Sequence, residues 1–205
     1  MNNTFISNAI ECSYKRITKL NDKAIRMRGM SSFKVRNFLN KLLEIPNSRY
    51  LEIGVWQGST FYSALYGNSP ESAVAIDNFS NPPSDQAIFI RNMDDVGTKF
   101  EFINSDCFLT KEKLDSKKFN IYFYDGDHSE ESHYQALKYF YDNLDDEFIY
   151  ICDDWNWQNV KDGTHRAIKE LNIAIIEEWD LPSRCNSDRE SWWNGIWVSI
   201  LRKTK

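Results

Sequence analysis

Acidic residues follow four of the strands that the sequence predicts, and they are the side chains best suited to chemistry. They are Asp77, Asp106, Asp125 and the pair Asp153 and Asp154. Because ligands of open parallel sheets bind beyond the carboxyl ends of the strands, these carboxylates are expected at one binding edge. Neighbouring carboxylates raise one another's pKa unless a cation or a hydroxyl-rich ligand compensates them. For Asp106 alone, a helix cap or turn former is an equally good interpretation.

The tetrapeptide from Asp125 to His128, with the sequence Asp-Gly-Asp-His, is the most specific acidic cluster. Gly126 allows a sharp turn after the strand, so His128 is expected to point into the same mouth as Asp125. Asp127 has a structural explanation as an N-cap whose capping box is completed by Glu130. A lone histidine is more often structural, but beside a metal cluster His128 becomes a candidate catalytic base.

Asp125, Asp153 and Asp154 are the predicted metal ligands. Three hard carboxylates without sulfur suit Mg²⁺, Mn²⁺ or Ca²⁺ rather than zinc, and we expect Mg²⁺. An alcohol is a poor nucleophile at neutral pH. A cation that stabilises alkoxide character and a base that takes the proton would therefore serve a reaction at a hydroxyl group.

The stretch 49–60 passes from a short buried strand through a glycine-punctuated turn into a helix. Gly54 and Gly58 are expected where a ligand approaches the backbone, and Ser59 where it can cap the helix. The spacing Gly-x-x-x-Gly matches neither the dinucleotide fingerprint nor the phosphate loop, which disfavours NAD and ATP. Asp77 ends the next predicted strand, where an acid can accept hydrogen bonds from both ribose hydroxyls; a plain loop acid is the structural alternative.

Strand and helix patterns alternate along the chain. Predicted strands cover 50–54, 73–77, 100–104, 120–125 and 147–152, and predicted helices cover 59–66, 84–96, 130–144 and 160–171. Continuous apolar strands of this kind predict an α/β fold, a doubly wound and mostly parallel seven-stranded sheet with helices on both faces. The last two strands, 172–179 and 195–201, have no helix between them and are expected to form an antiparallel hairpin at one edge.

Helical periodicity before the first strand predicts two helices, within 6–17 and 35–42, in an N-terminal cap segment 1–48 that precedes the main domain 49–205. The 205 residues, 41% of them hydrophobic, can bury a core. A net charge of −5 argues against nucleic acid as a partner. Because no apolar run could span a bilayer and the four scattered cysteines indicate reduced thiols, a cytoplasmic protein with no membrane partner is expected.

Two further features bear on a substrate. The tryptophans at 155, 157, 192 and 193 could line the mouth and stack on a ring of the acceptor, although core packing explains them equally well. The basic segment 26–30 could be a lid over an anionic group.

Five motifs in chain order resemble those of class I S-adenosylmethionine-dependent methyltransferases. They occupy 50–60, 74–77, 103–106, 121–128 and 149–154. The Asp-Gly-Asp-His and Asp-Asp motifs most resemble metal-dependent O-methyltransferases of small molecules, including those that act on macrolide sugars. The resemblance covers roughly residues 49–202. It departs from the family at the first motif, which lacks the commoner Gly-x-Gly-x-Gly pattern.

The resemblance implies S-adenosylmethionine as cofactor, a divalent metal, and a hydroxyl group of a small molecule such as a sugar as acceptor. By position, Glu52, Gly54, Gly58 and Ser59 would hold the methionine part of the cofactor, Asp77 the ribose, and Asp106 the adenine edge. Asn78 would be a further cofactor-binding residue. Asp125, Asp153 and Asp154 would ligate the metal, and His128 would be the general base. A homo-oligomer is compatible with this interpretation.

Two other functions stay open at this point. A metal-dependent nucleotide-sugar glycosyltransferase could use Asp125-Gly126-Asp127 to hold a metal and a diphosphate, although this leaves the corner at Gly54 and Gly58 unexplained. An inactive nucleoside-binding module would bind the cofactor without turnover.

Overall fold

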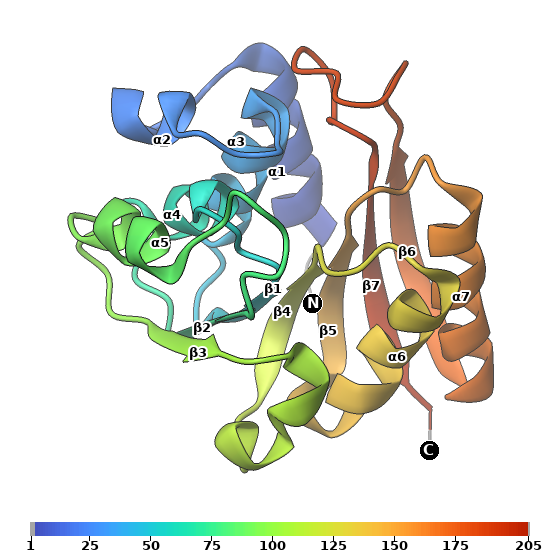
Figure 1. Cartoon of the computed structure of the whole chain (residues 1–205). Helices are drawn as coiled ribbons and strands as arrows, with labels where there is room; N and C mark the ends of the chain where they lie inside the picture. Colours follow the sequence, from blue (N-terminus) through green and yellow to red (C-terminus); the bar gives the residue numbers. More distant parts are fainter. Residues whose placement is uncertain (1–2, 205) are drawn as a thin grey trace.

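A seven-stranded sheet separates two layers of helices in the computed structural model, which describes residues 3–204 (Figure 1). The strands are β1 Arg49–Ile53, β2 Ser72–Asp77, β3 Glu101–Asn104, β4 Phe119–Tyr124, β5 Leu144–Cys152, β6 Ile173–Leu181 and β7 Ile196–Lys203. Their order in the sheet is β3-β2-β1-β4-β5-β7-β6. All pairs among β1 to β5 are parallel, and β7 is antiparallel to both of its neighbours. The predicted doubly wound, mostly parallel sheet is confirmed.

The helices follow the predicted alternation with the strands. They are α1 Asn3–Lys15, α2 Asp22–Arg26, α3 Phe33–Leu42, α4 Ser59–Leu65, α5 Gln86–Met93, α6 Glu130–Phe140 and α7 Gln158–Glu170, with short 3₁₀ helices at Cys107–Leu109, Lys111–Leu114 and Tyr141–Asn143. The N-terminal segment contains three α-helices rather than the two expected. The additional helix, α2, is only five residues long and is capped by Asn21, so it is too short to show a helical period in the sequence.

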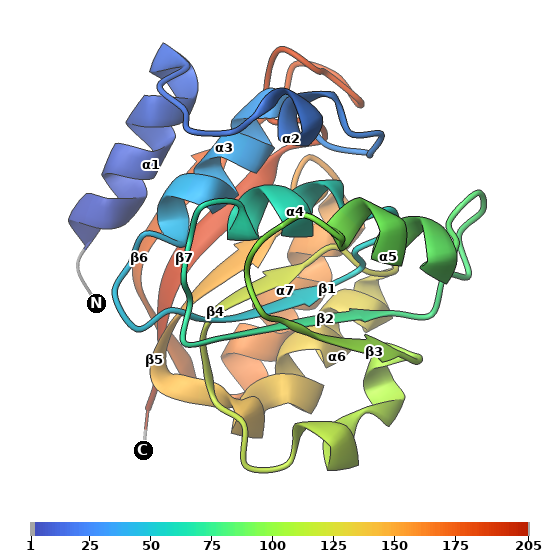
Figure 2. The ribbon, with the colours of Figure 1, turned by 90° about the vertical axis from the view of Figure 1, so that its left-hand side faces the viewer.

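Alternate side chains of each central strand enter different cores because successive residues of a strand point to opposite faces. Tyr50 and Ile121 belong to the apolar cluster that includes α1, α3, α4 and α5. Leu51 and Tyr122 belong to the cluster under α6 and α7. Figure 2 shows the two helical layers on opposite sides of the sheet. Burial on both faces explains why most residues of β1, β2 and β4 are apolar.

The C-terminal hairpin forms as predicted, but its second strand enters the sheet between β5 and β6. β7 is buried over most of its length, whereas the edge strand β6 is buried only at its two end residues and is half-buried or exposed between them. Cys152, the last residue of β5, pairs with Trp197 near the start of β7. The connection 182–195 therefore arrives at the carboxyl edge of the sheet, next to the end of β5.

The N-terminal helices pack on the main domain. Ile6 of α1 and Leu39 of α3 lie in the same apolar cluster as Tyr50 of β1. Trp192 donates a hydrogen bond from Nε1 to the hydroxyl of Tyr14 at 3.0 Å, which ties α1 to the connection 182–195. No helix within residues 3–204 is long and apolar enough to cross a membrane.

Candidate active site

A cavity of about 400 Å³ opens at the carboxyl ends of β1, β2 and β4. It lies where the strand order reverses between β1 and β4, the usual ligand position in doubly wound sheets. Its walls include the predicted site residues Gly54, Ser59, Asp77, Asn78, Asp106, Asp125 and His128. They also include Met30, Trp56, Thr60, Tyr124, Asp127 and Ser132. Most of the residues singled out in the sequence thus meet at one cavity.

Gly54 and Gly58 both serve the packing of the fold, and of the two only Gly54 lies in the cavity wall. A Cβ on Gly54 would lie 1.8 Å from the carbonyl oxygen of Asp125, so the glycine lets the ends of β1 and β4 come together. Gly58 has φ +91° and is not part of the cavity wall. A Cβ there would lie 3.1 Å from the ring of Phe89, so Gly58 faces α5. Ser59, the next residue, does reach the cavity.

Asp77 ends β2 at the cavity wall. Its Oδ2 accepts a hydrogen bond from the backbone N–H of Trp56 at 2.7 Å, and its Oδ1 accepts one from Phe79 at 2.6 Å. These bonds fix the carboxylate, and each oxygen keeps a second lone pair for a ligand. Burial raises the pKa of Asp77 above its ordinary value.

Asp106 caps a short helix, as one of the two interpretations expected, and its predicted contact with the cofactor stays a prediction. Its Oδ1 accepts a hydrogen bond from the N–H of Phe108 at 2.9 Å and caps the 3₁₀ helix Cys107–Leu109. The side chain is exposed, and it also lies in the cavity wall.

Glu52 lies beneath the cavity and forms no part of its wall. Its two carboxylate oxygens accept hydrogen bonds from the hydroxyls of Tyr50 and Thr60. Burial raises the pKa of Glu52 to about 7, against its ordinary 4.5. Glu52 can reach a ligand only through Thr60, which does line the cavity.

Asp125 and Asp153 form a carboxyl pair at the ends of β4 and β5, in which Asp153 is buried and Asp125 is half-buried in the cavity wall. Burial, followed by the repulsion of neighbouring carboxylates, raises the pKa of both groups well above the ordinary value. Oδ1 of Asp153 is buried and has no hydrogen-bond partner. Such a pair carries an unbalanced negative charge whenever both members are ionised.

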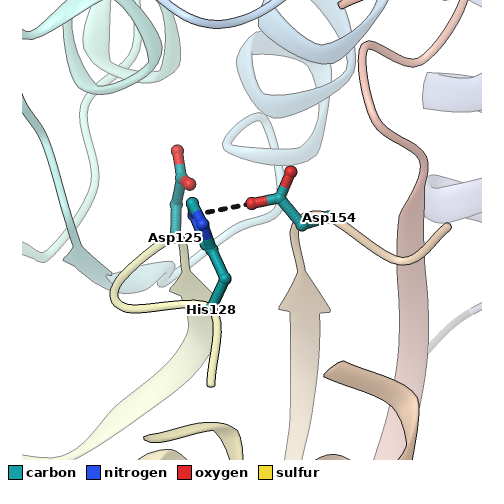
Figure 3. A group of neighbouring side chains, drawn as sticks. All are labelled: Asp125, His128 and Asp154. Carbon is teal, nitrogen blue, oxygen red and sulfur yellow. Dashed lines mark ion pairs between the residues drawn. The ribbon is translucent and has the colours of Figure 1, made fainter. Parts of the chain in front are cut away.

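His128, which lines the cavity, faces the buried Asp154 (Figure 3). Nε2 of His128 lies 2.7 Å from Oδ2 of Asp154, which is 2% exposed, whereas the His128 side chain is 43% exposed. The hydrogen bond to Asp154 raises the pKa of His128 above its ordinary value. Asp154 has φ +56°, a left-handed conformation that aspartate tolerates better than most residues.

Asn194 holds the second oxygen of Asp154. Its Nδ2 donates a hydrogen bond to Oδ1 of Asp154 at 2.5 Å, and its own Oδ1 accepts one from the N–H of Ser187. The backbone carbonyl of Asn194 also accepts a hydrogen bond from Asn156 at 2.9 Å. The connection 182–195 thereby fixes Asp154 as the partner of His128.

The donor set fits a hard divalent cation. One ligand atom from each of Asp125, His128 and Asp154 lies within 4.8 Å of the others. The group offers carboxylate oxygens and one imidazole, and the unpartnered Oδ1 of Asp153 lies beside it. Oxygen-rich sets of this kind suit Mg²⁺ or Mn²⁺. Asp153 stands outside the three-residue group, so its predicted role as a ligand stays a prediction.

Three of the four tryptophans considered for the mouth belong to the core. Trp155, Trp192 and Trp193 are 3%, 1% and 9% exposed. Trp155 stacks on Trp197, with ring centroids 4.8 Å apart. Trp157 alone lies beside the site, with its ring edge-to-face against His128 at 4.9 Å.

The sequence of residues 51–155, just over half of the chain, matches the family model described as "Methyltransferase domain". The chain belongs to this methyltransferase family. The matched region runs from β1 to the residue after Asp154 and so contains nearly all of the cavity wall. This membership favours the methyltransferase interpretation over a nucleotide-sugar glycosyltransferase. No curated protein matches this chain at a significant level.

Solved structures show the same fold at low sequence identity. An O-methyltransferase from Bacillus cereus, in complex with S-adenosylhomocysteine, is 13% identical with a TM-score of 0.63, and the match covers 98% of this chain and 100% of that one. A methyltransferase from Podospora anserina, bound to S-adenosylhomocysteine, is 16% identical with a TM-score of 0.61 over 100% and 98% of the two chains. The O-methyltransferase TomG from Streptomyces achromogenes, in complex with S-adenosylmethionine, is 11% identical with a TM-score of 0.58 over 98% and 91%.

Other methyltransferase structures are longer. This chain spans 50% of one of them and 48% of a second, from Streptococcus mutans. Together the family and the structures establish the class I S-adenosylmethionine-dependent methyltransferase fold that the sequence motifs resemble.

Several residues of the site were absent from the sequence interpretation. Trp56 lines the cavity, and Asn194 and Arg36 hold segments beside it. Met30, which also lines the cavity, belongs to the basic segment 26–30 that the sequence indicated as a possible lid. The expected cap segment 1–48 thus contributes at least Met30 to the cavity. Neither Asn194 nor Arg36 has a local sequence signal. Asn194 contacts a residue that is far from it in the chain, and Arg36 contacts neutral backbone carbonyls.

Proposed function

We propose that this protein transfers a methyl group from S-adenosylmethionine to a hydroxyl oxygen of a small molecule. The observation that carries the proposal is that one cavity joins two kinds of wall. Asp77 and Asp106 line one part of the cavity, where their carboxylates can accept hydrogen bonds from the hydroxyls of a nucleoside. Asp125 and His128 line another part. When bound, the cofactor supplies a methyl group on a sulfonium centre, which an oxygen nucleophile can attack.

His128 is the proposed base. In its neutral form, an N–H at Nε2 donates to Asp154, and Nδ1 then carries the lone pair that can accept a hydroxyl proton. Asp154 stabilises the imidazolium that results, and Asn194 holds Asp154 in place. The orientation is thus set by a chain of three side chains, and such preorganisation is worth several kcal/mol to a transfer reaction.

Asp125 and Asp154, with Asp153 beside them, are the proposed ligands of a divalent cation such as Mg²⁺. When bound, such a cation lowers the pKa of a coordinated hydroxyl group. The chain's own contribution is the carboxyl pair of Asp125 and Asp153, whose charges a cation would balance.

The direct test is a screen of hydroxylated metabolites with S-adenosylmethionine and Mg²⁺, read by mass spectrometry for products that have gained one methyl group. We expect an acceptor whose methylation is lost in His128→Ala while S-adenosylhomocysteine still binds. Binding without turnover on any acceptor would favour the inactive nucleoside-binding module. Binding of a UDP-sugar in place of S-adenosylhomocysteine would contradict the proposal.

A further inference from the structure

Arg36 of α3 is a buried cation with no acidic partner within residues 3–204. Its side chain donates from Nε to the hydroxyl of Ser31 at 2.8 Å, and from Nη1 to the carbonyls of Ala24 and Met27 at 2.9 and 2.8 Å. Every one of these partners is neutral. Arg36 is only 4% exposed.

A buried charge without a counter-charge is unfavourable, which makes Arg36 unusual in this fold. Burial, with a smaller contribution from Arg189, lowers the pKa of Arg36 to about 10. The guanidinium therefore still carries its charge at neutral pH. The surrounding carbonyl oxygens offset part of the desolvation and leave the charge available to an anion.

Arg36 is connected to the cavity through two serines. The hydroxyl of Ser31, which accepts from Arg36, lies 3.3 Å from the hydroxyl of Ser59 in the cavity wall. A Cβ built on Gly29 would lie 1.9 Å from Oγ of Ser59 and 3.0 Å from Nη2 of Arg36. Gly29 therefore lies against both Ser59 and the guanidinium of Arg36, and no side chain would fit between them.

The charges of the cavity wall are strongly one-sided. Asp77, Asp106, Asp125 and Asp127 line it, and no lysine or arginine of the described chain does. An anionic group of a ligand would be repelled by these acids and attracted toward the wall at Ser59, where Arg36 stands behind the surface.

We propose that Arg36, acting through Ser31 and Ser59, recognises the carboxylate of the amino-acid part of the cofactor. This inference rests on the proposed function, in which that carboxylate is the cofactor's only anionic group. Arg36 is a positioning residue in this arrangement because it acts through the two hydroxyls.

The test compares two ligands by calorimetry. S-adenosylhomocysteine carries the carboxylate, and methylthioadenosine has the same nucleoside without the amino-acid part. Arg36→Gln should weaken S-adenosylhomocysteine by about 10- to 100-fold, the size of one or two charge-assisted hydrogen bonds, and leave methylthioadenosine unchanged. The matched control is Arg91→Gln, which removes an exposed arginine of α5 that lies outside the cavity wall and should affect neither ligand. Arg36→Lys keeps the charge and should retain more affinity than Arg36→Gln.

Equal weakening of both ligands in Arg36→Gln would overturn the inference and leave Arg36 as a support of the segment 24–31. If Arg36→Gln does not fold, Ser31→Ala takes its place, because it breaks the connection between Arg36 and Ser59. A loss of S-adenosylhomocysteine affinity with methylthioadenosine affinity unchanged supports the inference, and equal affinity for S-adenosylhomocysteine in wild type and Ser31→Ala overturns it. Failure of the wild type to bind any of these nucleosides would instead contradict the cofactor assignment itself.

Discussion

Nε2 of His128 lies 2.7 Å from Oδ2 of Asp154, so the exposed imidazole is held by a carboxylate that is itself buried. The bond stabilises the imidazolium and raises the pKa of His128 above 6.5. A base must be neutral to accept a proton. We therefore expect kcat/KM for the acceptor to rise with pH through a midpoint above the ordinary pKa of histidine.

Asp154→Asn removes the charge that raises this pKa and should move the midpoint to lower pH. It should also lower kcat/KM by roughly 10²- to 10⁴-fold, because the imidazole loses its fixed tautomer. The measurement is a pH profile of kcat/KM for wild type, Asp154→Asn and His128→Ala, and the rising limb should be absent in the last. The same rise of kcat/KM with pH in all three proteins would show that His128 is not the base.

Divalent metal should stabilise the folded protein. A ligand at about 100 times its Kd adds about 2.7 kcal/mol to the free energy of unfolding, so Mg²⁺ or Mn²⁺ should raise the Tm. Asp125→Asn should abolish that shift because it removes one predicted metal ligand from the carboxyl pair of Asp125 and Asp153. Asp127→Asn is the control, since Asp127 is exposed and accepts a hydrogen bond from Ser129 outside the three-residue group. A shift that persists in Asp125→Asn would place the metal elsewhere.

Gly58→Ala should reduce stability and leave S-adenosylhomocysteine affinity intact. A new Cβ would combine the strain of φ +91° with a contact of 3.1 Å to Phe89, for a cost of about 1–3 kcal/mol. Gly97→Ala separates the two effects, because Gly97 has φ +76° and nothing within 4 Å of its Cβ position. Urea unfolding should show the larger loss at Gly58. If cofactor affinity falls and stability does not, Gly58 touches the ligand as the sequence predicted.

Glu52 should make stability depend on pH. Its pKa of about 7 in the folded protein exceeds the ordinary 4.5, so the native state binds the proton more tightly. The stabilisation is complete below about pH 4.5 and is lost as pH rises through about 7, a change of about 3 kcal/mol at ~1.4 kcal/mol per pH unit. Glu52→Gln cannot ionise and should lose less stability over this range. Unfolding free energies that change in parallel for the two proteins would contradict the raised pKa.

The fold was predictable because its signals are local. Leu51 and Tyr50 sit in an apolar strand buried on both faces, and the acids at 77 and 125 end such strands, so the sequence indicates both the sheet and its binding edge. His128 and Asp154 face each other because they follow β4 and β5, which are neighbours in the sheet. The correct placement of β7 was not predictable, because a hairpin sequence does not say which of its strands inserts into the sheet.

The supporting contacts of the site were beyond sequence reasoning for a different reason. Asn194 reaches Asp154 across 40 positions, and this contact exists only because β7 starts beside the end of β5. Gly58 looked like a ligand contact because glycines in such turns often are, yet here the packing of α5 requires it. Contacts of this kind depend on tertiary packing and leave no periodic pattern.

Calorimetric titration of S-adenosylhomocysteine into wild type and Asp77→Ala tests the central claim, that this cavity is a cofactor site, most directly. Both Asp77 oxygens are held by backbone N–H groups and have a lone pair left for a ribose hydroxyl. Asp77→Ala should weaken binding by roughly 30-fold or more, the value of two hydrogen bonds to a charged acceptor. Asp85→Ala, which removes an exposed acid that caps α5 away from the cavity, should not. Undiminished affinity in a folded Asp77→Ala protein, or no binding by the wild type, would contradict the account.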